Sequence, residues 1–283
     1  MRWMVSVLWS DMKTSFSTLG CPDWSVSKAL SEAQRMGFNG VELRFVNGSD
    51  ALWELPELQP GTLPATRREV AGRGLEISGV GVRAHFHFTD PAKRKEQIDE
   101  AKRDIDIAGA LHSTGARIWG DKVQPGGDRE STMKWISEAI WTLAEYGRPM
   151  KVNMRLETHG DFTSSADTLK ILRECGCHGA AVTWDPANVL AGSGEKPAAG
   201  AAALGPYIEH VHFKDEKLFG GGRRDITLLG QGDIPLPEIV ASLKKLKYRH
   251  FVSLEWEKKN FPNAVGPEIA FPDFIAWWKA HGA

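Results

Sequence analysis

Four short apolar runs in the chain each end on a residue that is able to bind a metal ion. The runs VNMRLE, AAVTWD, IEHVH and FVSLE end at Glu157, Asp185, His212 and Glu255. A parallel strand that is buried on both faces reads as a continuous apolar run, and the carboxyl ends of such strands open onto one face of a barrel. We therefore expect the four side chains to converge on one site.

The spacing and chemistry of these residues support a shared metal ion. Consecutive members of the set are 28, 27 and 43 positions apart, and the two shorter intervals have room for one strand, one helix and two loops. Three carboxylates and one imidazole form an oxygen-rich ligand set, which favours Mn²⁺, Mg²⁺ or Co²⁺ over a structural zinc. We predict one divalent ion at these four residues, with Mn²⁺ as the first choice and Mg²⁺, Co²⁺ or Zn²⁺ as alternatives.

Each of the four residues also has an ordinary structural explanation. Asp185 precedes Pro186, so its carboxylate would cap a helix that starts with proline. Glu157, His212 and Glu255, taken singly, would be polar residues at the water-facing ends of strands. Their joint occurrence on four successive strand ends, in the same inward phase, favours the metal site.

The elements that must position these residues alternate along the chain. Four further strands are expected near Phe16, Val41, Ser78 and Ile118, which gives eight in all. Helical patterns lie between them, at residues 24–37, 91–115, 131–147, 164–176, 198–205, 236–248 and 271–282. Strict alternation with eight strands predicts an α/β fold, a single (β/α)8 TIM barrel. Residues 1–283 are expected to form one domain, with residues 1–12 as a ragged start.

Strand alternation also predicts which neighbours of the metal ligands face the barrel interior. If the four ligands point inward, a second inward layer lies below them, formed by Arg155, Thr183, His210 and Ser253. Trp184 and Trp256 then point outward and pack against helices. The direction of Trp119 stays open.

Composition limits the partners of the protein. The chain has 35 Lys and Arg against 36 Asp and Glu, so it lacks the broad positive field that holds nucleic acid. No run of about 20 apolar residues indicates a membrane span, and three cysteines cannot complete a disulfide framework. We expect a cytoplasmic protein with a small-molecule partner, no nucleic acid and no membrane, and a homo-oligomer stays open.

Seven segments carry motifs of a known family: TSFSTLGCPDW at 14–24, GFNGVELR at 37–44, LETHGDF at 156–162, TWDPANV at 183–189, HVHFKD at 210–215, LLGQGDIPLPEIV at 228–240 and SLEWEKK at 253–259. Together they resemble the xylose isomerase-like barrel superfamily, in its sugar phosphate isomerase/epimerase branch. The resemblance runs from about residue 13 to residue 280. Its motifs identify the superfamily better than they identify the reaction.

The resemblance implies an eight-stranded barrel with one divalent metal on the same four residues. It further implies that Glu157 and Glu255 are catalytic: they flank the carbon next to a carbonyl and exchange its proton, while the metal stabilises the developing enediolate. A divalent cation does lower the barrier to removing such a weakly acidic proton. The implied activity is that of a metal-dependent isomerase or epimerase of a ketose or related small carbohydrate.

The chain departs from the epimerase pattern at Asn188. Many relatives have histidine there, whereas an amide forms hydrogen bonds but does not titrate. This keeps open a dehydratase or lyase that acts on a keto-inositol, keto-glycoside or related keto-polyol by the same proton abstraction. A metal-stabilised binding or scaffold barrel is the non-enzyme alternative. An endonuclease on abasic DNA is disfavoured by the charge balance and by the small number of histidines at the strand ends.

Further residues near the strand ends are candidates for substrate binding: Glu42, His85, His87, His159, Asn188, Lys214 and Arg223. The histidines have structural roles as their alternative. Lys214 is next to a ligand strand and could form an ion pair that orients a ligand. Arg223 follows three glycines, so it could clamp a phosphate or carboxylate, or belong to a mobile surface loop.

Overall fold

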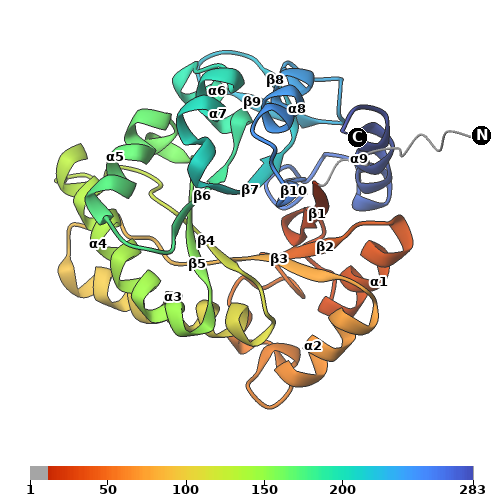
Figure 1. Ribbon diagram of the computed structural model, residues 1–283, viewed down its shortest axis with the longest axis horizontal. Coiled ribbons are helices and arrows are strands. Elements are labelled where there is room, and N and C mark those ends of the chain that lie inside the picture. Colours follow the sequence, from red (N-terminus) through yellow and green to blue (C-terminus); the bar gives the residue numbers. More distant parts are fainter. Residues whose placement is uncertain (1–11, 283) are drawn as a thin grey trace, which may run out of the picture.

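The computed structural model describes residues 12–282 of the 283-residue chain. Eight parallel strands close into a barrel in the order β1-β10-β7-β6-β5-β4-β3-β2, with the helices around it (Figure 1). The strands are β1 Lys13–Ser17, β2 Gly40–Leu43, β3 Glu76–Gly81, β4 Gly115–Trp119, β5 Asn153–Glu157, β6 Ala180–Trp184, β7 Ile208–Phe213 and β10 Phe251–Leu254. The predicted (β/α)8 TIM barrel is confirmed, and so are its eight strands. The ragged start expected at residues 1–12 lies, apart from Met12, outside the described residues.

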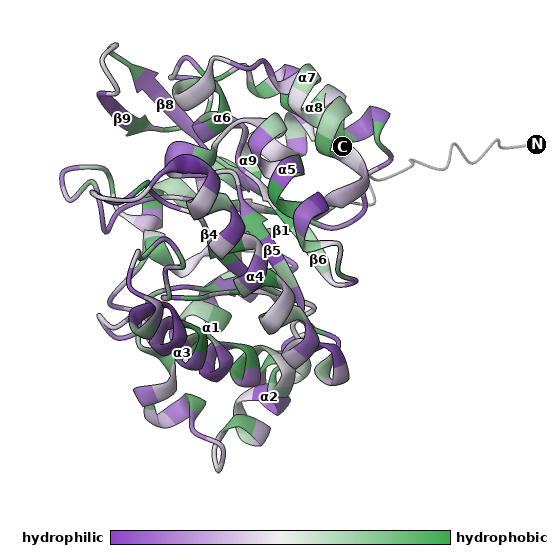
Figure 2. Cartoon of the chain, turned by 90° about the vertical axis from the view of Figure 1, so that its left-hand side faces the viewer, coloured by the Kyte–Doolittle hydropathy of each residue, from purple (hydrophilic) through white to green (hydrophobic). Residues whose placement is uncertain are grey.

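The helices form the outer layer and bury one face against the strands. They are α1 Val26–Met36, α2 Leu63–Gly72, α3 Pro91–Ala110, α4 Arg129–Gly147, α5 Ser165–Cys175, α6 Pro186–Ser193, α7 Pro197–Leu204, α8 Leu236–Lys245 and α9 Pro267–His281. Figure 2 shows hydrophilic and hydrophobic stretches alternating along α3 and α4. This division is typical of helices that cover a core with one face and meet water with the other.

Short polar side chains start several of these helices. Ser25, Asp90, Asp128 and Ser164 each accept a hydrogen bond from a backbone N–H in the first turn of the helix that follows. Such caps satisfy N–H groups that have no partner within the helix. They fix where each loop ends, and thereby hold the strand-to-helix loops at the face of the barrel where the metal-binding residues lie.

The helix α2 and a hairpin were not predicted, and of α6 only the start at Asp185 and Pro186 was expected. The helix α2 carries a short apolar stripe of Leu63, Thr66 and Val70, and α6 has eight residues, so each offers few repeats of the helical period. The hairpin of β8 Asp215–Leu218 and β9 Arg224–Thr227 projects beside the barrel (Figure 2). Three consecutive glycines with positive φ, residues 220–222, make the turn of this hairpin.

The predicted inward layer is seen in the contacts of its side chains. Arg155 crosses the barrel to donate to the Ser78 carbonyl and to Thr114 Oγ1, both at 2.8 Å. Gly115 makes room for it, since a Cβ atom there would lie 2.1 Å from the Arg155 guanidinium. His210 and Ser253 meet in the interior on the carboxylate of Glu42.

The two tryptophans behave as expected of outward-facing residues. Trp184 is fully buried with its indole Nε1 close to Gly200 of α7. Trp256 donates from Nε1 to the carbonyl of Val265 at 3.0 Å. Within residues 12–282, no helix combines the length and the apolar character needed to cross a membrane.

Asp104 on α3 provides a test of the buried layer between helices and barrel. Its side chain is inaccessible to solvent, Oδ2 accepts from the Arg83 N–H at 3.3 Å, and Oδ1 lacks a hydrogen-bond partner within the described chain. Burial raises the pKa of Asp104 to about 8, although the Arg83 N–H opposes this. The folded protein therefore keeps a proton on Asp104 that the unfolded chain releases.

We predict that Asp104→Asn stabilises the protein increasingly as the pH rises from about 4 to about 8. Wild type loses stability over this interval because its unfolded state binds fewer protons at residue 104, with a slope of up to about 1.4 kcal/mol per pH unit. Urea unfolding of both proteins at pH 4, 6 and 8 measures the difference. A difference that does not change with pH would contradict the prediction.

Candidate metal centre

The structure brings the four predicted metal ligands together at the carboxyl ends of four strands. Glu157 ends β5, Asp185 directly follows β6, His212 lies in β7, and Glu255 directly follows β10. One ligand atom from each lies within 4.8 Å of the others, and all four side chains are buried. A barrel layout in which β5, β6, β7 and β10 are consecutive neighbours accounts for this convergence.

Asp185 combines a structural role with a place in the centre. Its backbone is extended, and its Oδ1 accepts the N–H of Asn188 at 2.9 Å, so the side chain caps α6. Pro186 occupies the first helical position, as the sequence predicted. Because one carboxylate oxygen satisfies the cap, the other, Oδ2, is left pointing at the centre. The structural and the metal-binding explanations of Asp185 therefore apply to different oxygen atoms of one residue.

His212 is the central imidazole of the group. Its Nδ1 lies 3.0 Å from Glu157 Oε1 and 3.2 Å from Glu255 Oε1, and its Nε2 lies 3.0 Å from Glu42 Oε1. Burial alone would lower the pKa of His212, but the three carboxylates raise it well above the ordinary value. Without a metal, His212 is therefore an imidazolium that donates from both ring nitrogens.

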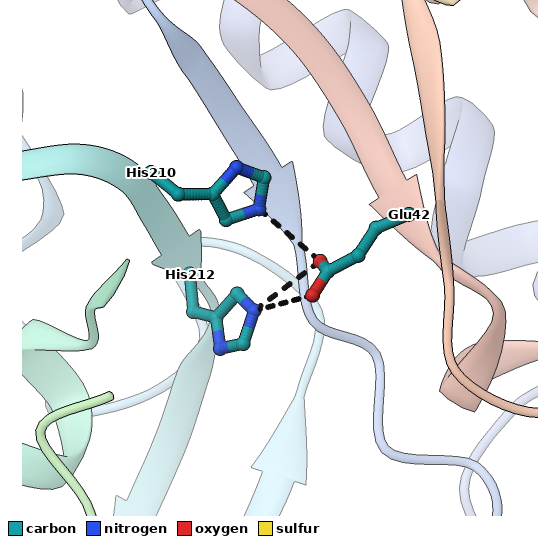
Figure 3. Close-up of side chains that lie close together, drawn as sticks. All are labelled: Glu42, His210 and His212. Carbon is teal, nitrogen blue, oxygen red and sulfur yellow. Dashed lines mark hydrogen bonds and ion pairs between the residues drawn. The ribbon is translucent and has the colours of Figure 1, made fainter. Parts of the chain in front are cut away.

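Below the centre, Glu42 joins two histidines of β7 (Figure 3). Its carboxylate accepts from His210 Nε2 at 3.2 Å, from His212 Nε2 and from Ser253 Oγ at 2.8 Å. Burial opposes ionisation of Glu42, but His212 and His210 hold its pKa well below the ordinary value. Glu42 contacts Nε2 of His212, whereas Glu157 and Glu255 contact Nδ1, and Glu42 does not line the cavity, so it lies beneath the centre. A carboxylate in this position fixes the ring orientation of the histidine that it contacts.

Lys214 places a buried ammonium group among the carboxylates. Its Nζ lies 2.8 Å from Asp185 Oδ2, 2.6 Å from Glu255 Oε2 and 2.7 Å from Glu257 Oε1. Burial would lower the pKa of Lys214, but these carboxylates raise it well above the ordinary value. Lys214 thus occupies oxygen atoms of two predicted metal ligands as well as a third acid, Glu257.

The donor set fits a divalent cation. Glu157 Oε2 and Asp185 Oδ2 are buried and accept no well-aligned hydrogen bond from a described residue, although each lies close to a cation, Arg117 at 3.3 Å and Lys214 at 2.8 Å. Three carboxylates with one imidazole suit a hard or borderline ion. Burial, together with the charges of Glu255 and Glu157, raises the pKa of Asp185 to about 7 in spite of Lys214. The group therefore carries negative charge that its own cations do not fully balance.

A cavity of about 140 Å³ opens above the centre, which is room for a small molecule. Its lining consists of Leu19, Arg44, Phe45, Arg117, Trp119, Glu157, His159, Lys214, Glu255, Glu257 and Asn260. A larger hollow of about 710 Å³ lies on the outer surface along α4 and the end of α5. Active sites of such barrels lie at the carboxyl ends of the strands, so the smaller cavity is the one that can hold a reacting molecule.

Residues 30–281 match the xylose isomerase-like TIM barrel family. The chain belongs to this family. No curated protein matches the sequence, so the family is the finest level at which sequence comparison places it. The resemblance seen in the motifs is thereby confirmed.

Solved structures of other proteins share the architecture over nearly the whole chain. A D-psicose 3-epimerase solved in the presence of D-fructose has a TM-score of 0.76 and 16% identity, with 96% of this chain and 100% of that chain covered. The probable 3-DHS dehydratase AsbF from Bacillus anthracis has a TM-score of 0.75 and 19% identity, with 95% of this chain and 99% of that chain covered. The 3-keto-D-glucoside 4-epimerase YcjR from E. coli has a TM-score of 0.73 and 13% identity, with 95% of this chain and 99% of that chain covered. At these identities the likeness shows the fold alone.

Within this family fold, His85, His87 and His159 lie on one wall around Asp121. The three Nδ1 atoms are 3.6, 3.8 and 4.0 Å from the Asp121 carboxylate. His85, His87 and Asp121 also form a group able to hold a metal ion. Trp119, whose direction the sequence left open, stacks between His85 and His159 with ring centroids 5.0 and 4.8 Å away. Of the three histidines, His159 lines the cavity.

Arg223 and Asn188 are placed differently from each other. Arg223 is exposed in the hairpin turn and packs its guanidinium over the ring of Phe219, so it does not line the cavity. The next residue, Arg224, donates to Asn188 Oδ1 at 2.7 Å and lies 3.3 Å from Glu216 Oε2. Asn188 is therefore held by an arginine at the start of β9.

Sequence reasoning missed several residues of the cavity: Arg44, Phe45, Arg117, Glu257 and Asn260. Arg44 directly follows β2 and obeys the strand-end rule that found the metal ligands, whereas Arg117 lies in the middle of β4. The available signal was a charged residue inside or at the end of an apolar run. Glu257 and Asn260 come from the loop after β10, where the sequence has no periodic pattern.

We predict that Glu42→Ala lowers the free energy of unfolding by about 3 to 5 kcal/mol, because it removes the shared acceptor of three buried donors. Urea unfolding followed by circular dichroism measures the loss. Glu76→Ala is the matched control: Glu76 forms an exposed ion pair with Lys13, for which a loss of at most about 1 kcal/mol is expected. Equal losses in the two variants would contradict a structural role for Glu42.

Proposed function

We propose that this protein is a metal-dependent isomerase or epimerase of a ketose or related small carbohydrate. The observation that carries the proposal is the set of four ligand atoms within 4.8 Å of one another, two of which belong to glutamates that line a small cavity. Membership of a family whose solved members include sugar epimerases agrees with it. The reaction is proton transfer at a carbon next to a carbonyl group.

The residues proposed to hold the metal are Glu157, Asp185, His212 and Glu255, with Mn²⁺ as the preferred ion. When bound, the ion supplies positive charge that stabilises the oxygen anion formed as the proton leaves carbon. To ligate the ion, His212 would lose the proton on Nδ1. The proton on Nε2 would stay on the ring and continue to donate a hydrogen bond to Glu42. Lys214 would keep its contact with Glu257, which is not one of the proposed metal ligands. This contact would hold the ammonium group close to the centre when the ion binds Asp185 and Glu255.

Glu157 and Glu255 are proposed to move the proton. Both line the cavity, and each directs Oε1 to His212 and Oε2 to a cation, Arg117 at 3.3 Å or Lys214 at 2.6 Å. Burial raises the pKa of Glu157, but Arg117 and His212 outweigh it and hold that pKa low. A carboxylate on either side of the substrate carbon allows one to remove a proton and the other to return it on the opposite face.

The remaining candidates receive different roles in this proposal. His159 and Lys214 line the cavity and would contact the substrate. Asn188 does not line the cavity and is bonded to Arg224, so no contact with the substrate is assigned to it. Glu42 is assigned to orienting His212, because its carboxylate is buried below the metal ligands. His85 and His87 support the wall of Trp119 and His159. Arg223 has no role in the proposed reaction.

We expect Asp185→Ala or His212→Ala to abolish retention of Mn²⁺, because each removes one of four ligands from a buried site. Metal content after dialysis, measured by mass spectrometry of the dissolved protein, gives the result. Asp106→Ala on the exposed face of α3 is the control and should bind as wild type does. Unchanged metal content in both ligand variants would refute the site.

Deuterium exchange tests the reaction. Wild type with Mn²⁺, incubated in D₂O with ketoses, keto-inositols and 3-keto-glycosides, should incorporate deuterium beside the carbonyl of its substrate, as seen by proton NMR. Glu157→Gln and Glu255→Gln should slow this exchange by about 10²- to 10⁴-fold, whereas the surface variant Glu76→Gln should not. An isomeric product establishes the epimerase or isomerase.

The same experiment decides between the proposed function and its alternatives. An unsaturated product would show that the protein is a dehydratase or lyase and not an epimerase. The structural observation that favours this alternative is the amide of Asn188, which is bonded to Arg224. Full metal retention without exchange or product across the panel would point to the non-enzyme alternative, a metal-stabilised binding barrel.

A further inference from the structure

Two buried arginines form part of the cavity wall next to the carboxylates. Arg44 follows β2 and is 6% exposed, and Arg117 lies in β4 and is 3% exposed. Both line the same cavity as Glu157 and Glu255. The strands β2 and β4 lie outside the consecutive set β5, β6, β7 and β10 that carries the proposed metal ligands. The cavity thus has an acidic side and a basic side.

The guanidinium groups of this basic side have donors to spare. Arg44 Nη1, Arg117 Nε and Arg117 Nη1 are buried, and none of them finds a hydrogen-bond acceptor among the described residues. No described carboxylate lies within 4.0 Å of Arg44, whereas Arg117 approaches Glu157 Oε2 at 3.3 Å. A buried donor without an acceptor destabilises the fold. Such donors are tolerated where a ligand supplies the missing acceptor.

The arginines are held in place by contacts other than ion pairs. Their guanidinium carbons lie 5.3 and 4.5 Å from the ring centre of Trp119. Gly81 leaves the space that the Arg44 side chain fills, because a Cβ at residue 81 would lie 2.4 Å from Arg44 Cδ. The Arg44 backbone N–H is fixed by Thr18 Oγ1 at 2.8 Å. These contacts orient the guanidinium groups before any ligand arrives.

Electrostatics in the cavity favour an anion at this wall. Burial and the positive charge of Arg117 lower the pKa of Arg44 to about 10, although Asp50, Asp104 and Glu157 oppose this. Two guanidinium groups that repel each other in a buried cavity are stabilised by a shared negative charge. The contact with Glu157 accounts for the charge of Arg117. Arg44 has no described carboxylate within 4.0 Å, and Asp50, Asp104 and Glu157 act on it only from farther away.

We propose that Arg44 and Arg117 form a subsite for an oxyanion of the substrate, either a carboxylate or a phosphate group. The planar guanidinium matches the two oxygens of either group. The inference deepens the proposed function and rests on it for the reaction: the substrate is an acidic or phosphorylated small carbohydrate whose anionic group lies at Arg44 and Arg117. Its carbonyl end then lies toward Glu157 and Glu255, in a cavity that is too small for a polymer.

Isothermal titration calorimetry on metal-free protein tests the subsite, since without metal an anion cannot bind by ligating the ion. The probes are inorganic phosphate, D-gluconate, and D-glucitol, which has a hydroxymethyl group in place of the carboxylate. We expect both anions, or one of them, to bind, and D-glucitol to bind at least about tenfold more weakly than the anion that binds. Tighter binding of phosphate identifies a phosphorylated substrate, and tighter binding of D-gluconate identifies an acid.

Arg44→Gln and Arg117→Gln should each weaken binding of the anion by at least about tenfold. The matched control is Arg83→Gln, because Arg83 follows β3 and its guanidinium lies 3.7 Å from Asp50, outside the cavity. Should a glutamine variant fail to fold, the corresponding lysine variant keeps the charge but loses the two-pronged donor, and a smaller weakening is expected. Circular dichroism checks the fold of each variant.

The subsite is refuted if neither anion binds, if D-glucitol binds as well as D-gluconate with phosphate silent, or if the arginine variants keep wild-type affinity. Failure of the proposed function has a different signature. Asp185→Ala should lose Mn²⁺ and keep anion binding, so intact anion binding without deuterium exchange in wild type would leave the subsite standing and remove the epimerase.

Discussion

The structure depends on the pairing of opposite charges inside a closed barrel. Six titratable side chains that contact one another directly, Glu42, Glu157, Asp185, His212, Lys214 and Glu255, are each at most 5% exposed. Burying a single charge costs several kcal/mol unless a partner and hydrogen bonds compensate it. Here each acid contacts an imidazole or an ammonium group, and His212 contacts acids on both sides of its ring.

The paired side chains lie in two layers of the barrel interior, and the two layers have different roles. In the lower layer, Glu42 accepts hydrogen bonds from His210 and Ser253. Arg155 donates to Thr114 and to a backbone carbonyl. In the upper layer, Glu157 Oε2 and Asp185 Oδ2 lie near the cations Arg117 and Lys214 but accept no well-aligned hydrogen bond from a described residue. The hydrogen bonds of Glu42 and Arg155 join several strands below the centre, and such a base holds the residues above it in position for a ligand.

The cavity adds a difference between its two sides. Acids from β5 and from the loop after β10 face arginines from β2 and β4, and the ring of Trp119 lies against both guanidinium groups. A small molecule with a carbonyl at one end and a negative charge at the other matches this distribution. In a cavity with little water such charges act over short distances with little screening, so they orient a substrate as well as bind it.

Much of this protein could be predicted from its sequence. The apolar runs predicted all eight barrel strands, because a strand buried on both faces needs apolar residues throughout. The same runs placed Glu157, Asp185, His212 and Glu255 at strand ends, and strand alternation placed His210 and Ser253 one layer below. These features follow from the local pattern of apolar and polar residues, which can be read directly from the sequence. Short elements such as α2 and α6 and the hairpin of β8 and β9 have too few repeats of any period to be read in that way.

Only the tertiary structure decided which side chains meet across the barrel. Glu42 lies 170 residues before His212, and its place below the centre follows from the closure of the sheet. The barrel also brings Lys214 onto Asp185, Arg224 onto Asn188 and Arg44 beside Arg117, in each case through contacts between different strands or loops. Sequence patterns report the direction in which a side chain leaves its own strand. They do not report what it meets, because that depends on strand order and register, which non-local pairing sets.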